Sequence, residues 1–404
     1  MHPIHKTGEF CKLAGANLLQ FARRCASNLS QGSNGTIYIA VIVLLISVIY
    51  AFYTGFRAPN IWSTNYYQTS FLDGIYRRAL LGNFLVPFGC LRFDYFFIVK
   101  IQFLILLSVI ILFVFIGMRA REFLTLIIFF LSSSGGYLFH EVGYVDQALW
   151  IFAAAAILAL ARDRLFIAAL ILSLSILAHE MAIFTTLPIV FAYVALQDKQ
   201  TISTYTKVFA LPATVFLVIS VFFQVVPVGT LEQYLANVVN CGGTISRKQD
   251  YFTVYLNQFL GRRARLYYSP EQMYLAILPL LALAITLMLY IRKRLDPAPI
   301  QQLLVLSCCI SPLFLGLFGF DTSRWFFLTF TQIIIVGFVA SSRINQGGPG
   351  IPLARIAYLI ALVLVGLQLH LKYFDGYFPR ALSLDNLETF PGYVTRQLAN
   401  LPRR

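Results

Sequence analysis

The sequence is 404 residues long; 59% of its residues are hydrophobic and only 12% are charged. That balance excludes a soluble globular domain and predicts an all-α, polytopic membrane helix bundle. The formal net charge of +14 would suggest nucleic-acid binding in a soluble protein. Here the cations fall mostly between apolar runs, where they set membrane topology, so we expect membrane lipids as neighbours and no nucleic-acid partner.

The first 35 residues form a polar, basic leader, which we expect on the cytoplasmic side. Apolar residues recur at helical spacing between Phe10 and Ala22, with Lys12 and Arg23 on the other side. This pattern indicates a short helix lying on the membrane surface. We expect no cleavable signal peptide, because the first apolar run begins near residue 36 and is long enough to span a bilayer.

Eleven apolar runs follow, and each is a candidate transmembrane helix. They cover roughly residues 36–55, 96–117, 123–139, 147–161, 165–178, 181–196, 208–228, 273–290, 303–318, 326–340 and 356–371. Several are shorter than the roughly 20 residues that a straight membrane-crossing helix needs. We expect those helices to extend into flanking polar residues or to end inside the bundle, and we assign 36–371 to one transmembrane helical domain.

The lysines and arginines predict how these runs are oriented. With the N-terminus inside, every inner segment between runs carries cations, whereas the short outer turns 140–146 and 179–180 carry none. This asymmetry follows the positive-inside rule. The outer loops 56–95 and 229–272 and the tail 372–404 keep their cations, because long segments translocate largely regardless of charge. The predicted location is a bacterial inner (plasma) membrane, with the carboxyl end outside as a cap or a partly disordered tail.

The cysteines show neither a CxxC motif nor Cys/His zinc spacing. They are Cys11, Cys25, Cys90, Cys241, Cys308 and Cys309. We therefore expect no cysteine framework, and we interpret the adjacent pair inside an apolar run as small packing residues.

An ionisable cluster follows the first apolar run, in the stretch from Asp73 to Gly82. It places Asp73 close in sequence to Arg77 and Arg78. Charges at a membrane edge cost free energy unless they face water, protein or a ligand, so the cluster is a functional hypothesis. In one interpretation the aspartate caps an interfacial helix whose arginines anchor in lipid headgroups. In the other, the carboxylate acts on a substrate whose phosphate the arginines hold.

With this orientation, the polar residues of three short turns fall on the same outer face as Asp73. They are His140, Glu141 and Asp146, then His179 and Glu180, and finally Asp321 and Arg324. Inner segments carry basic residues of the usual topological kind, whereas these turns combine carboxylates, imidazoles and a guanidinium. We therefore expect them to line a single cavity at the outer membrane boundary.

Each of these turns has an alternative interpretation. The two His-Glu steps would suit a divalent metal ion or a general base. Neighbouring residues on a helix point about 100° apart, and no HExxH motif is present, which favours a polar network that ends helices and orients a ligand. No other cofactor is indicated. The segment 321–325 is equally consistent with an outer turn that holds an internal ion pair and an interfacial tryptophan.

The outer segment 229–272 interleaves basic and aromatic residues. Its cations include Arg262, Arg263 and Arg265, and tyrosines flank them. Arginine forks suit phosphate oxygens, and aromatic faces suit sugar rings or lipid headgroups. The alternative is an amphipathic loop anchored in headgroups.

The arrangement resembles the polyprenyl-phosphate-dependent membrane glycosyltransferases of the GT-C fold. In them the first extracytoplasmic loop bears an essential acidic residue, short outer turns supply further acidic or histidine residues, and basic residues hold the lipid phosphate. The resemblance implies Asp73 as the essential acid, with Glu141 and Asp146 as further catalytic groups. Phosphate contacts fall on Arg77, Arg78 or the cluster from 262 to 265. This chain departs from the pattern in two ways, with a single aspartate instead of paired carboxylates in the first loop and no large soluble C-terminal domain.

The resemblance implies a reaction as well as a fold. A sugar arrives on a polyprenyl-phosphate donor, and the arginines offset the charge that develops on the phosphate leaving group. Asp73 takes the proton from the hydroxyl of an envelope glycan, lipid or protein acceptor. A lipid-linked donor needs no nucleotide-binding loop, and the sequence contains none.

Three other functions are compatible with the sequence. A polysaccharide polymerase or ligase of the cell envelope would make products of many repeat units. A transporter or flippase would place charges near the bilayer midplane and often repeat its halves, whereas here the ionisable residues cluster at the ends of runs. A noncatalytic membrane assembly factor is the third.

Overall fold

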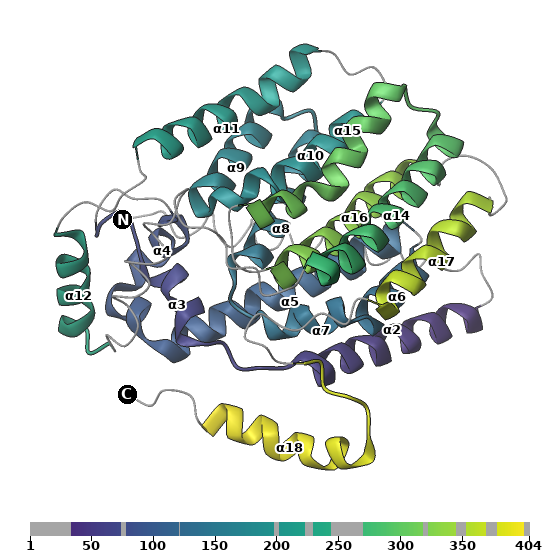
Figure 1. Cartoon of the computed structure of the whole chain (residues 1–404). Helices are drawn as coiled ribbons and strands as arrows, with labels where there is room; N and C mark the ends of the chain where they lie inside the picture. The colour runs from purple at the N-terminus through teal and green to yellow at the C-terminus, as the bar shows by residue number, and fades with distance from the viewer. Residues whose placement is uncertain are drawn as a thin grey trace.

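The computed structural model describes residues 34–73, 78–120, 122–197, 202–222, 229–243, 270–317, 322–344, 353–368 and 378–399. Every regular element in these ranges is a helix, which confirms the all-α class (Figure 1). The expected leader helix and the site candidates Arg77, Arg262, Arg263, Arg265 and Asp321 lie outside the described residues.

Six of the described helices are long and apolar enough to cross a membrane. They are α2 (Asn34–Gly55), α5 (Tyr95–Arg119), α11 (Ile202–Phe222), α14 (Pro270–Leu295), α15 (Pro299–Ile310) with the short helix η4 (Ser311–Leu317), and α16 (Thr322–Ile344). A seventh is counted if α6 (Phe123–Leu131) and α7 (Ser133–His140), which meet at a bend of 68°, form one broken span. The structure is therefore that of a polytopic membrane protein.

Four shorter apolar helices match the remaining predicted runs. They are α8 (Val145–Leu160), α9 (Leu165–Ala178), α10 (Thr186–Ala195) after the short helix η2 (Glu180–Ile183), and α17 (Leu353–Gln368). At about 1.5 Å per residue, helices of this length fall short of a hydrocarbon core about 30 Å thick. Within the described residues, each apolar run thus coincides largely with helix, but length alone does not make the short ones spans.

Five helices lie in segments that the sequence analysis left as loops or a tail. They are α3 (Ile61–Gln68), α4 (Leu80–Asn83), η1 (Val86–Phe93), α12 (Thr230–Asn240) and α18 (Leu384–Ala399). α18 runs beside α2 in Figure 1, and the segment around it bonds to the end of that helix. The Arg380 N–H donates to the Thr54 carbonyl at 3.0 Å, and the Tyr393 hydroxyl to that of Phe56 at 3.2 Å. Of the two expectations for the tail, these contacts favour the cap.

The core is centred on α16, whose membrane-length window is 94% buried. Two glycines allow helices to approach closely around it. A Cβ added to Gly55 of α2 would lie 1.8 Å from the carbonyl oxygen of Gly136 in α7. A Cβ on Gly337 of α16 would lie 3.0 Å from the Tyr358 hydroxyl of α17. At the first position, backbone packs directly on backbone, so no larger residue fits.

Contacts between helix ends sort them into two groups. At one end, which we call the disulfide end, α12 is bonded to the segment before α5 through Cys90 and Cys241. At the other, the Glu122 end, the start of α6 meets the end of α16 and the start of α17. The Glu122 carboxylate accepts a hydrogen bond from Ser341 at 2.7 Å and pairs with Arg355 at 3.3 Å. The cation pattern assigned the segments of the first group to the outside and those of the second to the inside, and this orientation stays a prediction.

The expectation that the cysteines form no framework is wrong for one pair. Cys90 and Cys241 form a disulfide with a Cα–Cα distance of 5.1 Å. They are 151 positions apart in the sequence, and a search for short spacing motifs does not detect pairs that only the fold brings together. Cys308 and Cys309 are free and buried, which agrees with their interpretation as packing residues.

The two ends should react from opposite sides of the membrane. Two exposed residues are suitable positions for single cysteine substitutions. They are Leu384, the first residue of α18, which is 78% exposed, and Lys293 in the last turn of α14. We expect a membrane-impermeant maleimide added outside intact cells to label Leu384→Cys and not Lys293→Cys, with the unsubstituted protein as background. Labelling with the reverse pattern would contradict the orientation, and labelling of both would contradict the two-group assignment.

Candidate functional site

Asp73 is the most heavily bonded carboxylate at the disulfide end. Its Oδ1 accepts hydrogen bonds from Arg92 at 2.8 Å and from the side-chain amide of Asn237 at 3.1 Å. Its Oδ2 accepts from the backbone N–H and the hydroxyl of Ser70, both at 3.0 Å. A carboxylate offers about four lone-pair sites, and all four are used. The Asp73 side chain is fully buried. Its hydrogen bonds join the turn at Ser70, the residue Arg92 and the helix that carries Asn237.

The local sequence explains how this cluster forms. The Asp73 backbone N–H donates to the Ser70 carbonyl at 3.0 Å, which closes a turn and aims the carboxylate back at residue 70. Arg92, at the end of η1, lies over the Phe93 ring at 4.5 Å and also donates to the Ser70 hydroxyl at 2.6 Å. The arginine that pairs with Asp73 is therefore Arg92, from the far end of the same outer segment, and Arg78 has a different partner.

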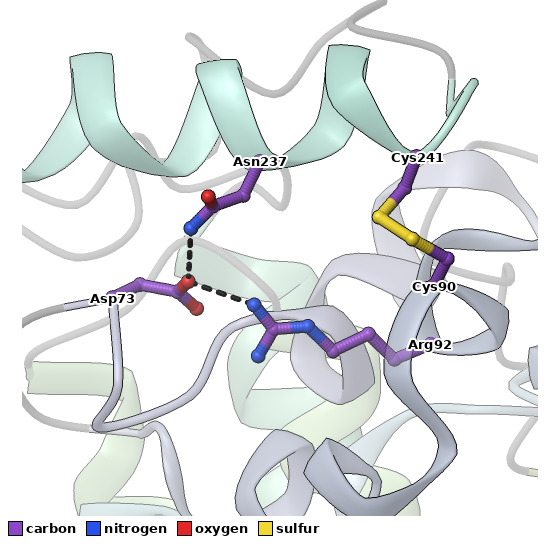
Figure 2. The surroundings of a disulfide bond; sticks show 5 residues. All are labelled: Asp73, Cys90, Arg92, Asn237 and Cys241. Carbon is purple, nitrogen blue, oxygen red and sulfur yellow. Dashed lines mark hydrogen bonds and ion pairs between the residues drawn. A yellow bond between two sulfur atoms is a disulfide. The ribbon is translucent and has the colours of Figure 1, made fainter.

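The disulfide and Asp73 together hold α12 against this segment (Figure 2). Asn237 lies one turn before Cys241 on α12, so the amide contact and the disulfide form two ties from one helix. Tyr234 of the same helix is fully buried, with its ring 6.0 Å from that of Phe93. Burial and the Asp73 carboxylate raise the pKa of the Tyr234 hydroxyl well above its ordinary value.

A second ion pair joins Arg78 to Glu180, the first residue of η2. The Arg78 Nε lies 2.8 Å from both carboxylate oxygens, and its Nη2 also donates to Oε1. Arg78 has φ = 66°, a conformation uncommon for a residue with a side chain. Glu180 begins η2, and the neighbouring His179 caps that helix by accepting the Met181 N–H on Nδ1 at 3.1 Å. The pair is nearly buried, with side chains 9% and 12% exposed.

A third pair joins the first turns of α8 and α16. The Nε of Arg324 donates to one oxygen of Asp146 at 2.7 Å and its Nη2 to the other at 2.9 Å. This bidentate geometry is among the strongest that an arginine and a carboxylate make. The Arg324 guanidinium also lies 4.9 Å from the centre of the Tyr144 ring. Asp146 benefits from its place in the first turn of a helix, where the dipole favours negative charge.

Tyr66 of α3 connects the turns that carry these pairs. Its ring centre is 6.0 Å from that of Tyr144 and 6.2 Å from that of His179. Burial and the nearby Glu141 carboxylate raise the pKa of Tyr144 well above its ordinary value. The structure thus brings the 140–146 and 179–180 turns and the start of α16 together around α3, whereas a single cavity that they line stays a prediction. Asp73 is bonded to a separate set of residues.

Several buried polar atoms near the Asp146–Arg324 pair have no hydrogen-bond partner among the described residues. They are the hydroxyls of Tyr67 and Thr322 and the indole nitrogen of Trp325. Burial, followed by Tyr66 and Asp146, raises the pKa of Tyr67, so its hydroxyl stays protonated as a donor. A buried donor without a partner costs about 1–3 kcal/mol. Tyr67 lies on α3, and Thr322 and Trp325 lie in the first turn of α16.

The remaining sequence candidates take supporting positions. The Nε2 of His140 lies 3.4 Å from Arg57, just after α2. The Glu141 carbonyl accepts from the amide of Gln147 at 3.3 Å, which links the turn to α8. Among the described residues, no three His, Cys, Asp or Glu side chains are grouped as metal ligands would be, and the divalent metal ion stays a prediction.

Sequence reasoning missed three contributors to this end of the molecule. Arg92 lay in the correct outer segment, but its partner depends on the fold of that segment. Asn237 and Tyr66 carry no charge, so a search for ionisable residues passes over them. For Arg92, the available sequence signal was its position two residues after Cys90 in the same outer segment.

Comparison with protein-family models, with curated proteins and with solved structures finds no match for this chain.

The Asp73 cluster should contribute mainly to stability. Replacing Asp73 by Asn leaves Arg92 buried without its counter-charge, so we expect a loss of about 3–5 kcal/mol. A lower thermal unfolding midpoint in mild detergent would show it. Asp94→Asn is the matched control. Asp94 caps α5 by accepting the Phe97 N–H at 2.8 Å, and asparagine caps equally well, so this change should be nearly neutral. Equal midpoints for the two variants would contradict the assignment.

The disulfide makes a separate prediction about thiol reactivity. In protein purified and denatured without reductant, Cys90 and Cys241 should resist maleimide and appear as one cross-linked peptide pair in mass spectrometry. Cys308 and Cys309 should react as soon as the protein is denatured, because they are free. Modification of Cys90 and Cys241 before any reductant is added would disprove the bond.

Proposed function

We propose that this protein is a membrane glycosyltransferase that moves a sugar from a polyprenyl-phosphate donor to an envelope acceptor at the outer face. The observation that carries the proposal is the buried site around α3. It combines two arginine–carboxylate pairs, two tyrosine rings and three buried polar atoms that have no partner among the described residues. Arginine forks suit a lipid phosphate, aromatic faces suit a sugar ring, and buried donors suit its hydroxyls.

The Arg78–Glu180 pair supplies the groups that the transfer needs. Its carboxylate is 12% exposed, against 3% for Asp146 and 0% for Asp73, which makes it the most accessible of the three. The donor phosphate displaces Glu180 from Arg78 and takes over the guanidinium. The freed carboxylate then accepts the proton of the acceptor hydroxyl as its oxygen bonds to the anomeric carbon. The bond from that carbon to the phosphate oxygen breaks, and Arg78 stabilises the charge that leaves with the phosphate.

The other acidic residues take positioning roles in this scheme. Asp73 uses all its acceptor sites on protein donors, which supports a part in holding α12 in place. Asp146 orients Arg324 through the bidentate contact. The assignment of the catalytic base to Asp73 stays a prediction, and the variants below distinguish it from Glu180.

The disulfide supports both the outer location and the full count of eleven spans. Disulfides persist on the oxidising side of a membrane, so Cys90 and Cys241 belong there together. The chain between them must then cross an even number of times. The long helices in that interval, α5, the bent α6–α7 pair and α11, give three crossings. For the total number of crossings to be even, an odd number of the short helices α8, α9 and α10 must also cross. If all three cross, the total is the six crossings that the apolar runs predict for this interval.

Transfer assays with Glu180→Gln test the chemistry. We would incubate purified protein in proteoliposomes with a panel of radiolabelled polyprenyl-phosphate sugars and with cell-envelope extract as acceptor. The unsubstituted protein should release polyprenyl phosphate from at least one donor. Glu180→Gln should lower kcat by about 10²-fold or more without raising the donor KM, because Arg78 is left free for the phosphate.

Matched variants separate catalysis from folding. Glu232→Gln changes an exposed carboxylate on α12 at the same end and should leave turnover unchanged. Normal turnover in Glu180→Gln combined with loss in well-folded Asp73→Asn would move the base to Asp73. Consumption of no donor in the panel by the unsubstituted protein would overturn the proposal.

A further inference from the structure

A groove lies at the Glu122 end, far from the site described above. It has a volume of about 790 Å³ and runs between the last turns of α14 and the first turns of α17. Its walls are apolar and include Leu289, Leu353, Ala354 and Ala357. Leu289 is 52% exposed and Leu353 is 80% exposed. Exposed leucines on the wall of a membrane bundle face hydrocarbon, so the groove is open to lipid.

The rim of this groove is basic. Arg292 and Lys293 line it and are exposed, and Asp296 lines it as the single acidic residue. Both cations lie in the last turn of α14, where the helix dipole favours positive charge. Arg355 of α17 does not add to the rim, because its guanidinium points to Glu122 inside the bundle at 3.3 Å. The lining is therefore net positive, at the point where apolar wall gives way to polar surface.

We propose that this groove binds an anionic phospholipid from the leaflet at the Glu122 end. An acyl chain lies along the leucine and alanine wall, and the headgroup phosphate contacts Arg292 and Lys293. Basic pockets between membrane helices on the cytoplasmic side suit such headgroups, and the cation pattern places this end on that side. The proposal is independent of the transferase reaction, because it uses none of the residues of that site.

Lipid titrations of the purified full-length protein test the groove. In uncharged detergent, the thermal unfolding midpoint is followed against added phosphatidylglycerol, with phosphatidylcholine as the neutral headgroup and glycerol phosphate as the soluble one. We expect phosphatidylglycerol alone to raise the midpoint. Arg292→Gln with Lys293→Gln should weaken its apparent affinity roughly 30-fold, at about 1 kcal/mol for each cation.

Two further variants distinguish a groove from general surface charge. Arg162→Gln with Arg164→Gln removes two exposed cations from the loop between α8 and α9 at the same end and should leave the affinity unchanged. Ala357→Trp fills the groove with both rim cations intact and should also weaken binding. Equal loss in the Arg162 and Arg164 control would overturn the proposal. The proposal would also be overturned if glycerol phosphate or phosphatidylcholine raised the unfolding midpoint as much as phosphatidylglycerol does, since either result would remove the need for an anionic lipid.

Discussion

Burial of charge is the constraint that shapes the disulfide end of this protein. Removing a carboxylate or a guanidinium from water costs several kcal/mol unless a partner meets it with good geometry. Asp73, Glu180 and Asp146 each meet one arginine, at side-chain exposures of 12% or less. Each pair joins segments that are separate in the sequence, by as many as 178 positions for Arg324 and Asp146. The pairs therefore help to fix which helix ends lie together.

Strong pairing also limits what these groups do chemically. A carboxylate held by a bidentate arginine is a good anchor and a poor proton acceptor until something competes for the arginine. A phosphate is such a competitor, because it offers the same fork geometry with more charge. Arg78 with Glu180 is the least buried pair, so in the proposed reaction it is the one that the donor phosphate reaches with the least rearrangement. The two more deeply buried carboxylates, Asp73 and Asp146, stay paired with their arginines and hold the surrounding helix ends in place.

The helices of this protein were predictable from sequence, and most of its site contacts were not. Apolar runs are a local signal, so within the described residues each one largely matched helix. The 140–146 and 179–180 turns were expected to lie together, and the structure brings both to α3, whereas their side of the membrane stays a prediction. By contrast, the choice of Arg92 over Arg78 as the partner of Asp73 depends on the path of residues 78–93. The disulfide depends on two segments that are 151 positions apart in the sequence. Neither has a local pattern, and α12 and α18 were missed because their residues are too polar for a hydropathy search.

The disulfide has a consequence for how the protein is made. The covalent ring that it closes contains the whole chain from α5 to α12. In the eleven-span arrangement, Cys241 reaches the oxidising side only after the sixth crossing of this interval has been inserted. In that arrangement Cys90 remains a thiol on the oxidising side while the intervening helices are synthesised. The other cysteines offer it no early partner, since Cys308 and Cys309 are made later and are buried, and the leader cysteines are on the other side in the same arrangement. If the eleven-span prediction holds, oxidation of Cys90 marks the moment in biosynthesis at which the first half of the bundle is in place.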